Sequence, residues 1–211
     1  MSPKKQYYET LAETLIEKFA HRGIEAYYVD NSEDALAMAR RYLIPECSVS
    51  WGGSETLNEI GLIAAIKASD CVAYDRLSAK TPEEKKEMYG KISTCDYYFM
   101  STNAITLDGE LVNVDGNGNR VACLIHGPEN VIIVAGMNKV ATDVESAHAR
   151  VRNIAAPPNT IRLNRKTPCT HTGKCENCLS PDCICSNIVI TRRSFIPNRI
   201  KVILVGEELG F

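Results

Sequence analysis

The feature that most constrains the fold is a continuous apolar run, Val131–Ala135, set among segments whose patterns alternate between strand and helix. A strand without polar alternation is typical of a parallel sheet, in which each strand is buried on both faces. Burying both faces requires helices above and below the strand. The run therefore predicts an α/β fold with a mainly parallel sheet flanked by helices.

The rest of the chain shows the alternation of strands and helices that an α/β fold needs. Apolar residues at helical spacing, together with capping residues, predict helices at about 5–22, 31–43, 54–60, 82–91, 119–126 and 142–155. Apolar or alternating runs predict strands at about 24–29, 47–51, 71–74, 97–101, 131–135, 188–191 and 201–205. The segment Ala155–Asn159, which contains two prolines, is expected to separate this body from a cysteine-rich segment.

Length and charge limit the classes of function. A chain of 211 residues suits one ordinary globular domain, and 24 basic against 26 acidic residues give a net charge of 24 − 26 = −2. This balance argues against a surface devoted to nucleic acid. No window approaches the roughly 18 uninterrupted apolar residues of a membrane span, and the first residues lack the apolar run of a signal peptide. We therefore expect a cytoplasmic protein with no membrane span and no nucleic-acid partner.

Nine cysteines are the unusual part of the composition. Four are scattered in or beside apolar runs and are expected to act as small buried hydrophobes: Cys47, Cys71, Cys95 and Cys123. The other five lie within seventeen residues: Cys169, Cys175, Cys178, Cys183 and Cys185. Because the cytosol keeps thiols reduced, this density indicates metal binding rather than disulfides.

Four thiolates could close a tetrahedral zinc site or hold an iron–sulfur cluster. Zinc ribbons usually bring two ligand pairs from distant positions, whereas one compact loop with a central Cys-x2-Cys favours a [4Fe–4S] cluster. Zinc, or no metal at all, remains the alternative. The expected ligands are Cys169, Cys175, Cys178 and Cys185. Cys183 is the alternate ligand because it lies only two residues from Cys185, and His171 is a less favoured one.

The cysteine loop, at about 165–187, is expected as an insertion near the end of a single domain, because the strands that follow it return the chain to the sheet. Residues 161–201 carry eight Lys or Arg against two acids. These cations could offset thiolate charge, form a solvated face, or dock an acidic electron-transfer partner.

Open α/β sheets bind ligands at the carboxyl ends of their strands, so the loops that leave the strands are the place for a site. Four such loops carry small and polar residues, at 51–56, 101–106, 111–120 and 136–139. Each could also be an ordinary turn, and the lysine of the last one could be solvated. The candidate ligand-binding residues are Gly53, Ser54, Asn103, Asp115, Gly116, Asn119, Arg120 and Lys139.

Two stretches carry a resemblance to a known family. The block Ser101–Val121, continuing through Gly127-Pro128-Glu129-Asn130-Val131, resembles the LUD domain of the lactate-utilisation proteins, and Gly53–Gly61 is similar to the family's other signature. The resemblance covers essentially the whole chain. It implies the fold shared by sugar-phosphate isomerases and CoA transferases.

The resemblance leaves the question of enzymatic activity open. Related isomerases use a carboxylate where this chain has Asn103, and an amide cannot abstract a proton. CoA transferases need a nucleophilic glutamate, for which Glu110 is only a distant candidate. An isomerase or transferase is the least favoured hypothesis, and its base would come from Asp108, Glu110 or Asp115.

The leading hypothesis from the resemblance is a protein of lactate or other organic-acid utilisation that contributes an iron–sulfur subunit to an oxidoreductase assembly. Its partners would be other subunits of a lactate-oxidising assembly, and a homodimer fits the base rate for such domains. The second hypothesis is a binding or regulatory protein for a small anionic metabolite, with a structural zinc loop.

Overall fold

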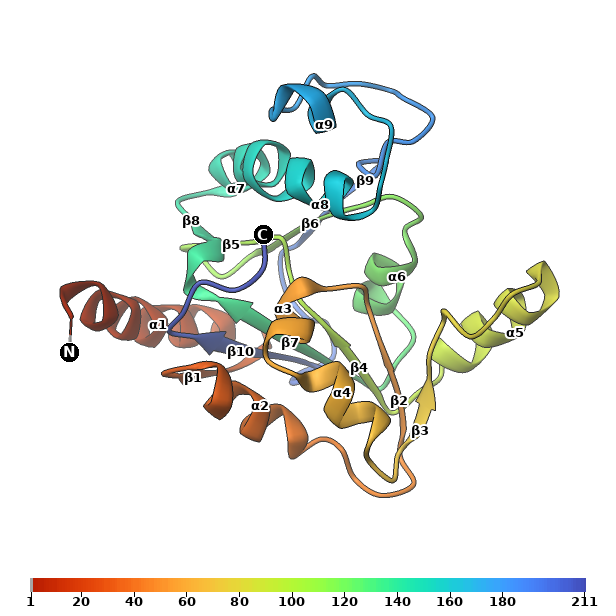
Figure 1. Cartoon of the computed structure of the whole chain (residues 1–211). Coiled ribbons are helices and arrows are strands. Elements are labelled where there is room, and N and C mark those ends of the chain that lie inside the picture. Colours follow the sequence, from red (N-terminus) through yellow and green to blue (C-terminus); the bar gives the residue numbers. More distant parts are fainter. Residues whose placement is uncertain (1) are drawn as a thin grey trace.

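The computed structural model describes residues 2–211 and is built on a six-stranded parallel sheet (Figure 1). Its strands are β1 (Glu25–Val29), β2 (Ser48–Trp51), β3 (Val72–Tyr74), β4 (Tyr97–Met100), β7 (Asn130–Gly136) and β10 (Ile200–Val205). The spatial order is β1-β10-β7-β4-β2-β3, and every neighbouring pair is parallel. The predicted α/β fold with a mainly parallel sheet is confirmed.

Helices cover both faces of this sheet, and three more, α7 to α9, lie away from it. The helices are α1 (Pro3–His21), α2 (Ser32–Arg40), α3 (Glu55–Glu59), α4 (Leu62–Lys67), α5 (Pro82–Ile92), α6 (Asn119–Ile125), α7 (Val144–Arg150), α8 (Ala156–Arg162) and α9 (Cys169–Thr172). Six of these helices lie in segments that were predicted to be helical: α1, α2, α3, α5, α6 and α7. The helices α4, α8 and α9 were not predicted. No helix in residues 2–211 is long and apolar enough to cross a membrane.

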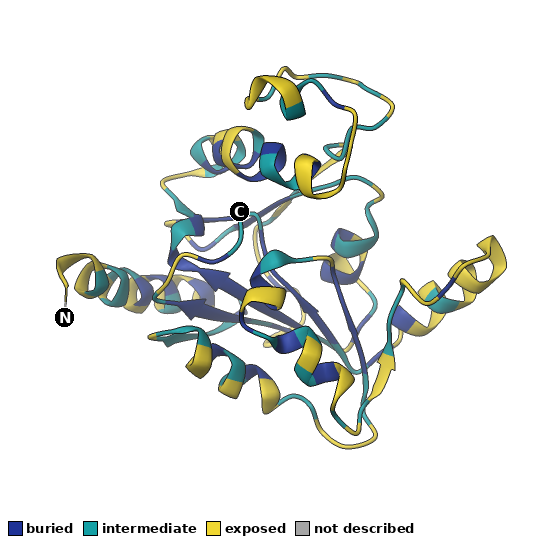
Figure 2. Ribbon diagram, viewed as in Figure 1, coloured by how far each residue is buried: buried dark blue, intermediate teal, exposed yellow. Residues whose placement is uncertain are grey.

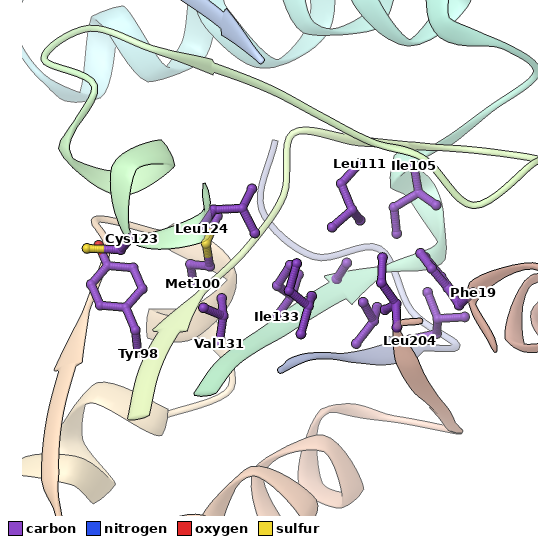
Figure 3. Close-up of a cluster of buried hydrophobic side chains, with 14 of the residues drawn as sticks. Phe19, Tyr98, Met100, Ile105, Leu111, Cys123, Leu124, Val131, Ile133 and Leu204 are labelled. Atoms are coloured by element: carbon purple, nitrogen blue, oxygen red, sulfur yellow. The ribbon is translucent and has the colours of Figure 1, made fainter. Parts of the chain in front are cut away.

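The apolar run that predicted the sheet lies in β7, which is buried (Figure 2), and its alternate residues belong to two different cores. Val131 and Ile133 pack in a cluster that includes Phe19 of α1, as Figure 3 shows. Ile132 and Val134 point to the other face, where α2, α3 and α4 supply the apolar side chains. Burial on both faces is the reason why this strand carries no polar residue between Val131 and Ala135.

A second, smaller sheet corrects two predictions. Its order is β8 (Val140–Ala141), β5 (Ala104–Thr106), β6 (Leu111–Asp115) and β9 (Asn187–Thr191). The segments 101–106 and 111–120 were expected to be loops, and the strand at 188–191 was expected to rejoin the main sheet. Instead β6 pairs antiparallel with both β5 and β9. Strands of three to five residues gain their stability from this pairing, so their own patterns are weak.

The expected break at Ala155–Asn159 is also wrong. The chain stays helical through α7, a π-helical turn at Val151–Ala155, and α8. Pro157 and Pro158 fall in the first turn of α8, directly after the π-helical turn. The prolines therefore lie within one helical stretch and do not end it. The cysteine loop follows α8 and precedes β9.

The four scattered cysteines differ in burial. Cys95 and Cys123 are buried in the core, as expected of small hydrophobes. Cys47 and Cys71 are half-buried, and their sulfurs lie 3.4 Å apart at the start of β2 and β3.

Gly136 at the end of β7 is closely surrounded by other backbone atoms, whereas Gly90 in α5 faces open space. Alanine substitutions at the two positions therefore test the packing at the end of β7. A Cβ at Gly136 would lie 2.6 Å from the carbonyl oxygen of Glu207 and 2.7 Å from the backbone nitrogen of Leu209. A Cβ at Gly90, within α5, would meet no atom within 4 Å. We expect Gly136→Ala to lower the free energy of unfolding by about 1–3 kcal/mol through overpacking. Gly90→Ala should raise it by roughly 0.5–1 kcal/mol, because alanine is the better helix former.

Urea denaturation of the two variants checks this prediction. Equal midpoints for Gly136→Ala and the wild type would show that the backbone after β10 yields to the added methyl group.

Candidate functional site

The carboxyl ends of four neighbouring strands, β7, β4, β2 and β3, converge on a pocket of about 320 Å³, which α8 and residues of the second sheet also line. We call this the anion pocket. All eight candidate residues taken from the sequence line it: Gly53, Ser54, Asn103, Asp115, Gly116, Asn119, Arg120 and Lys139. The rule that ligands bind at the carboxyl edge of a parallel sheet thus placed these residues together.

Lys139 is the deepest charged group of the pocket. It follows β7, is only 3% exposed, and its Nζ donates to Thr56 Oγ1 and Ser101 Oγ, each at 2.9 Å. Both acceptors are neutral hydroxyls, and Lys139 has no carboxylate ion-pair partner among residues 2–211. An ammonium carries three hydrogens, so one donor remains for a ligand.

Burial, with a smaller contribution from the cations Arg150 and Arg120, lowers the pKa of Lys139 to about 7. Glu59 acts in the opposite direction but more weakly. Desolvation disfavours the charged form of a lysine that has no counter-ion. A bound anion would supply that counter-ion and favour the protonated form.

Arg120 plays a different part from the one that its sequence position indicated. Its Nε donates to Asp115 at 3.1 Å, and its two terminal nitrogens donate to Ser101 O, Asn113 Oδ1, Asn103 Oδ1 and Val114 O at 2.7–3.0 Å. A guanidinium has five N–H donors, and these five bonds use them all. Arg120 therefore braces the pocket wall instead of donating to a ligand.

The brace fixes the orientation of Asn103. Its side-chain oxygen accepts from Arg120 Nη2 at 2.8 Å and from the backbone N–H of Val114 at 3.1 Å. Because the oxygen must face these two donors, the amide nitrogen faces the opposite way. Within residues 2–211 that nitrogen makes no hydrogen bond, so its two N–H groups are available to an acceptor in the pocket.

The small residues of the site allow close approaches. A Cβ at Gly53 would lie 2.9 Å from Nη2 of Arg76, and one at Gly116 would lie 3.3 Å from Cα of Ile184. Gly116 thereby lets the loop after β6 touch the cysteine loop. Ser54 is the N-cap of α3, and its hydroxyl accepts from Leu57 N.

Three cations of the pocket were not predicted: Arg76, Arg162 and Arg165. Arg162 lies 3.4 Å from Glu55, and Arg165 lies 3.7 Å from Asp182. Arg76 makes neither an ion pair nor a hydrogen bond with the described part of the chain. It follows β3 directly, so the carboxyl-edge rule could have found it. Arg162 and Arg165 reach the pocket from α8 and the residues after it, which no pattern placed there.

Two cations of the anion pocket have no acidic side chain as a partner among the described residues. Each acidic side chain of the pocket has an arginine partner: Asp115 with Arg120, Glu55 with Arg162, and Asp182 with Arg165. Lys139 and Arg76 are the cations left without a carboxylate in the described residues. A ligand with two negative charges would balance them.

Two of the candidate bases do not reach the pocket. Asp108 pairs with Lys18 at 3.2 Å, and Glu110 lies 3.8 Å from Arg22; neither lines the pocket. Asp115 does line it, but its carboxylate is held by Arg120 and by the backbone N–H of Gly118.

The five clustered cysteines line one second cavity of about 140 Å³, which we call the cysteine cavity. Several of their sulfurs accept hydrogen bonds there: Arg152 Nε donates to Cys175 Sγ at 3.2 Å, and the backbone N–H of Cys185 donates to Cys183 Sγ at 3.3 Å. His171 is exposed and does not line the cavity. No three His, Cys, Asp or Glu side chains of residues 2–211 are grouped closely enough to hold a metal ion.

The two cavities are neighbours. Six residues line both of them: Val114, Val151, Ala156, Cys183, Ile184 and Cys185. The segment Cys183–Cys185 therefore forms part of a shared wall between the thiols and the anion pocket.

Solved structures with a similar fold include a DUF162 family protein from Deinococcus radiodurans, which matches with a TM-score of 0.54 at 11% identity over 94% of this chain and 98% of that one. At this identity the likeness shows the fold alone. A D-ribose-5-phosphate isomerase in complex with phospho-erythronic acid matches with a TM-score of 0.34 at 14% identity, over 63% of this chain and 62% of that one. eIF2B delta from Chaetomium thermophilum matches at 0.32 and 17%, over 66% and 50%.

No curated protein matches the chain. A sequence model of the LUD domain matches residues 12–205, a range that includes the four strands of the pocket and the cysteine loop. Membership supports a role related to lactate utilisation at the level of the family. The match extends over most of the chain, and the protein belongs to the LUD domain family.

Proposed function

We propose that this LUD domain protein binds a small organic anion with two negative charges, a dicarboxylate or a phosphate monoester, in the anion pocket. The observation that carries the proposal is Lys139, a lysine that is 3% exposed, has neutral hydroxyl partners and keeps one donor for a ligand. A buried cation without a counter-ion lowers the stability of a fold, and an anionic ligand offsets this cost.

Two further groups define the ligand that fits. The Nδ2 group of Asn103 offers N–H donors, and Arg76 offers an unpaired guanidinium suited to a carboxylate or phosphate. The remaining pocket cations are neutralised by their own acids. Two uncompensated positive charges favour a dianion over lactate, which carries one negative charge.

The metabolic role that we propose is lactate or other organic-acid utilisation, with this chain as an iron–sulfur subunit of an oxidoreductase assembly. The observation that favours the iron–sulfur part is the cavity lined by all five clustered cysteines. A structural zinc in the same loop is the alternative, and it would make the protein a binding or regulatory one. Turnover by an isomerase mechanism is less favoured, because the carboxylate of Asp115 is occupied by Arg120.

Isothermal titration calorimetry at constant ionic strength tests the proposal with three probes: malate, glycerol 3-phosphate and L-lactate. We expect at least one dianion to bind about tenfold more tightly than lactate, since each added charge meets an unpaired cation. Equal affinities for all three would contradict the charge argument, and the absence of binding by all three would contradict the function.

The affinity for malate should fall as the pH rises. Below pH 7 the ammonium of Lys139 is already formed, whereas above it the free protein has lost this proton and must take one up to bind the anion. We expect the affinity to decrease by up to about tenfold per pH unit above pH 7, until the pKa of the complex is reached. Arg76→Met should bind more weakly but keep the same pH profile. A profile that is flat between pH 6 and 9 would remove Lys139 from the site.

A further inference from the structure

The cysteine cavity and the anion pocket share the wall Cys183–Cys185. We propose that a [4Fe–4S] cluster bound by Cys169, Cys175, Cys178 and Cys185 fills the cysteine cavity and lies directly against the anion pocket, so that cluster and bound anion sense each other's charge. This inference rests on the proposed anion binding and on the proposed iron–sulfur role of the loop, and it adds the coupling between the two sites.

The cysteine cavity has room for a group larger than a single ion. Zinc draws four sulfurs to about 2.3 Å from one centre, so that they lie within roughly 4 Å of one another. The thiols here are not grouped in that way in residues 2–211, yet all five surround one space. That space is about 140 Å³, far above the roughly 10–15 Å³ that a water-sized occupant needs.

The walls of the cysteine cavity suit a group of thiolates. Arg152 brings a positive charge to Cys175 at 3.2 Å, and the hydroxyl groups of Thr167 and Thr160 lie 3.1 and 3.4 Å from Cys169 Sγ. Hydrogen bonds to the sulfurs and nearby cations stabilise thiolate ligands and tune a cluster. The rest of the lining is largely apolar and includes Val114, Val151 and Ile188.

Cys183 is the thiol that a cluster held by the other four cysteines would not need. Four thiolates complete the coordination of a [4Fe–4S] cluster, so one of the five is spare. Cys183 is separated by a single residue from Cys185, and its sulfur already accepts the backbone N–H of Cys185. It also lines the anion pocket, as Cys185 does.

The shared wall gives the coupling a direction. Reduction adds a negative charge to the cluster, and an adjacent dianion opposes that addition. Binding of the anion should therefore lower the reduction potential of the cluster. By linkage, reduction of the cluster should weaken anion binding by the same factor. The contact between Gly116 and Ile184 joins the loop after β6, which carries the Arg120 partner Asp115, to this wall.

Iron and acid-labile sulfide analysis of the full chain, reconstituted without oxygen, tests the cluster. We expect about four irons and four sulfides per chain in the wild type, in Cys183→Ser and in the control Cys71→Ser, which changes a thiol outside the loop. Serine at each of the four ligand positions should remove most of the iron. One zinc without sulfide, no metal, or full iron in all four ligand variants would overturn the proposal.

Redox titration of the reconstituted protein with and without malate tests the coupling. We expect malate to lower the potential of the wild type and to leave that of Lys139→Met unchanged, while both keep their iron. Malate that binds the iron-loaded wild type without moving its potential would overturn the shared-wall placement. If the protein binds malate but takes up no cluster, the cluster is overturned and the proposed anion binding stands. If the protein holds a cluster but binds no anion, the proposed anion binding and the coupling are both overturned.

Discussion

Lys139→Met should lose about 100-fold in affinity for malate and at the same time unfold at a higher urea concentration than the wild type. The lost affinity follows from removing a charged donor in a dry environment, where a hydrogen bond between charged groups contributes about 1.5–3 kcal/mol. The gained stability follows from replacing a lysine that is 3% exposed by an apolar side chain of similar length. A residue kept at a cost to stability is typical of a binding site.

The gain in stability of Lys139→Met over the wild type should depend on the pH. In the folded protein the pKa of Lys139 is about 7, below its ordinary value of 10.5. Between these values the unfolded chain binds a proton that the folded chain does not, so the wild type loses stability as the pH falls from 10.5 to 7. Below pH 7 both states are protonated and the loss is constant. The advantage of Lys139→Met should therefore be largest at pH 7 and below, and it should shrink toward pH 10.

Urea denaturation at pH 6, 8 and 10, with calorimetric titration of malate, measures both effects. Lys85→Met is the matched control, because Lys85 is exposed on α5 and does not line the anion pocket. The control should bind malate normally, and its stability should change by less than about 0.5 kcal/mol at each pH. A destabilised Lys139→Met that still binds malate would make this lysine a structural group only.

The main sheet could be predicted because each of its strands carries its own signal. The run in β7 must be apolar on both faces, and the helices that follow the strands have clear caps, such as Asn31 before α2 and Thr81 before α5. The second sheet could not be predicted, because β5 and β6 exist through their pairing with each other and with β9. Asn113 illustrates the difficulty: it is a buried polar residue in β6, where its side-chain oxygen accepts from Arg120.

The sequence predicted which residues line the anion pocket better than it predicted what each of them does there. Lys139 and Asn103 were placed by one rule, that loops at the carboxyl ends of parallel strands meet. The rule does not say which side chains turn inward to hold the wall. Lys139 proved buried, and Arg120 proved to be fully bonded within the protein. Such facts depend on the tertiary environment of each side chain, which a sequence pattern does not contain.

Arg120→Met should lower the free energy of unfolding by about 3–5 kcal/mol, the range expected when one member of a partly buried charge network is removed. The Arg120 side chain is 13% exposed, and its ion-pair partner Asp115 is 11% exposed. Without the guanidinium, the side-chain oxygens of Asn113 and Asn103 lose donors, and the carboxylate of Asp115 loses its counter-ion. Arg120→Lys should recover little, because an ammonium has three donors and no planar fork to reach five acceptors.

The control for this change is Arg76→Met, which removes a cation from the same pocket. Arg76 makes no hydrogen bond or ion pair in residues 2–211, so its loss should change the urea midpoint very little and should weaken malate binding instead. Arg120→Met should show the opposite division, with a large loss of stability. If the two variants were equally stable, the five bonds of Arg120 would not hold the pocket wall, and Arg120 would return to being a ligand-binding cation. The contrast separates a brace from a binding group by a measurement that needs no knowledge of the natural ligand.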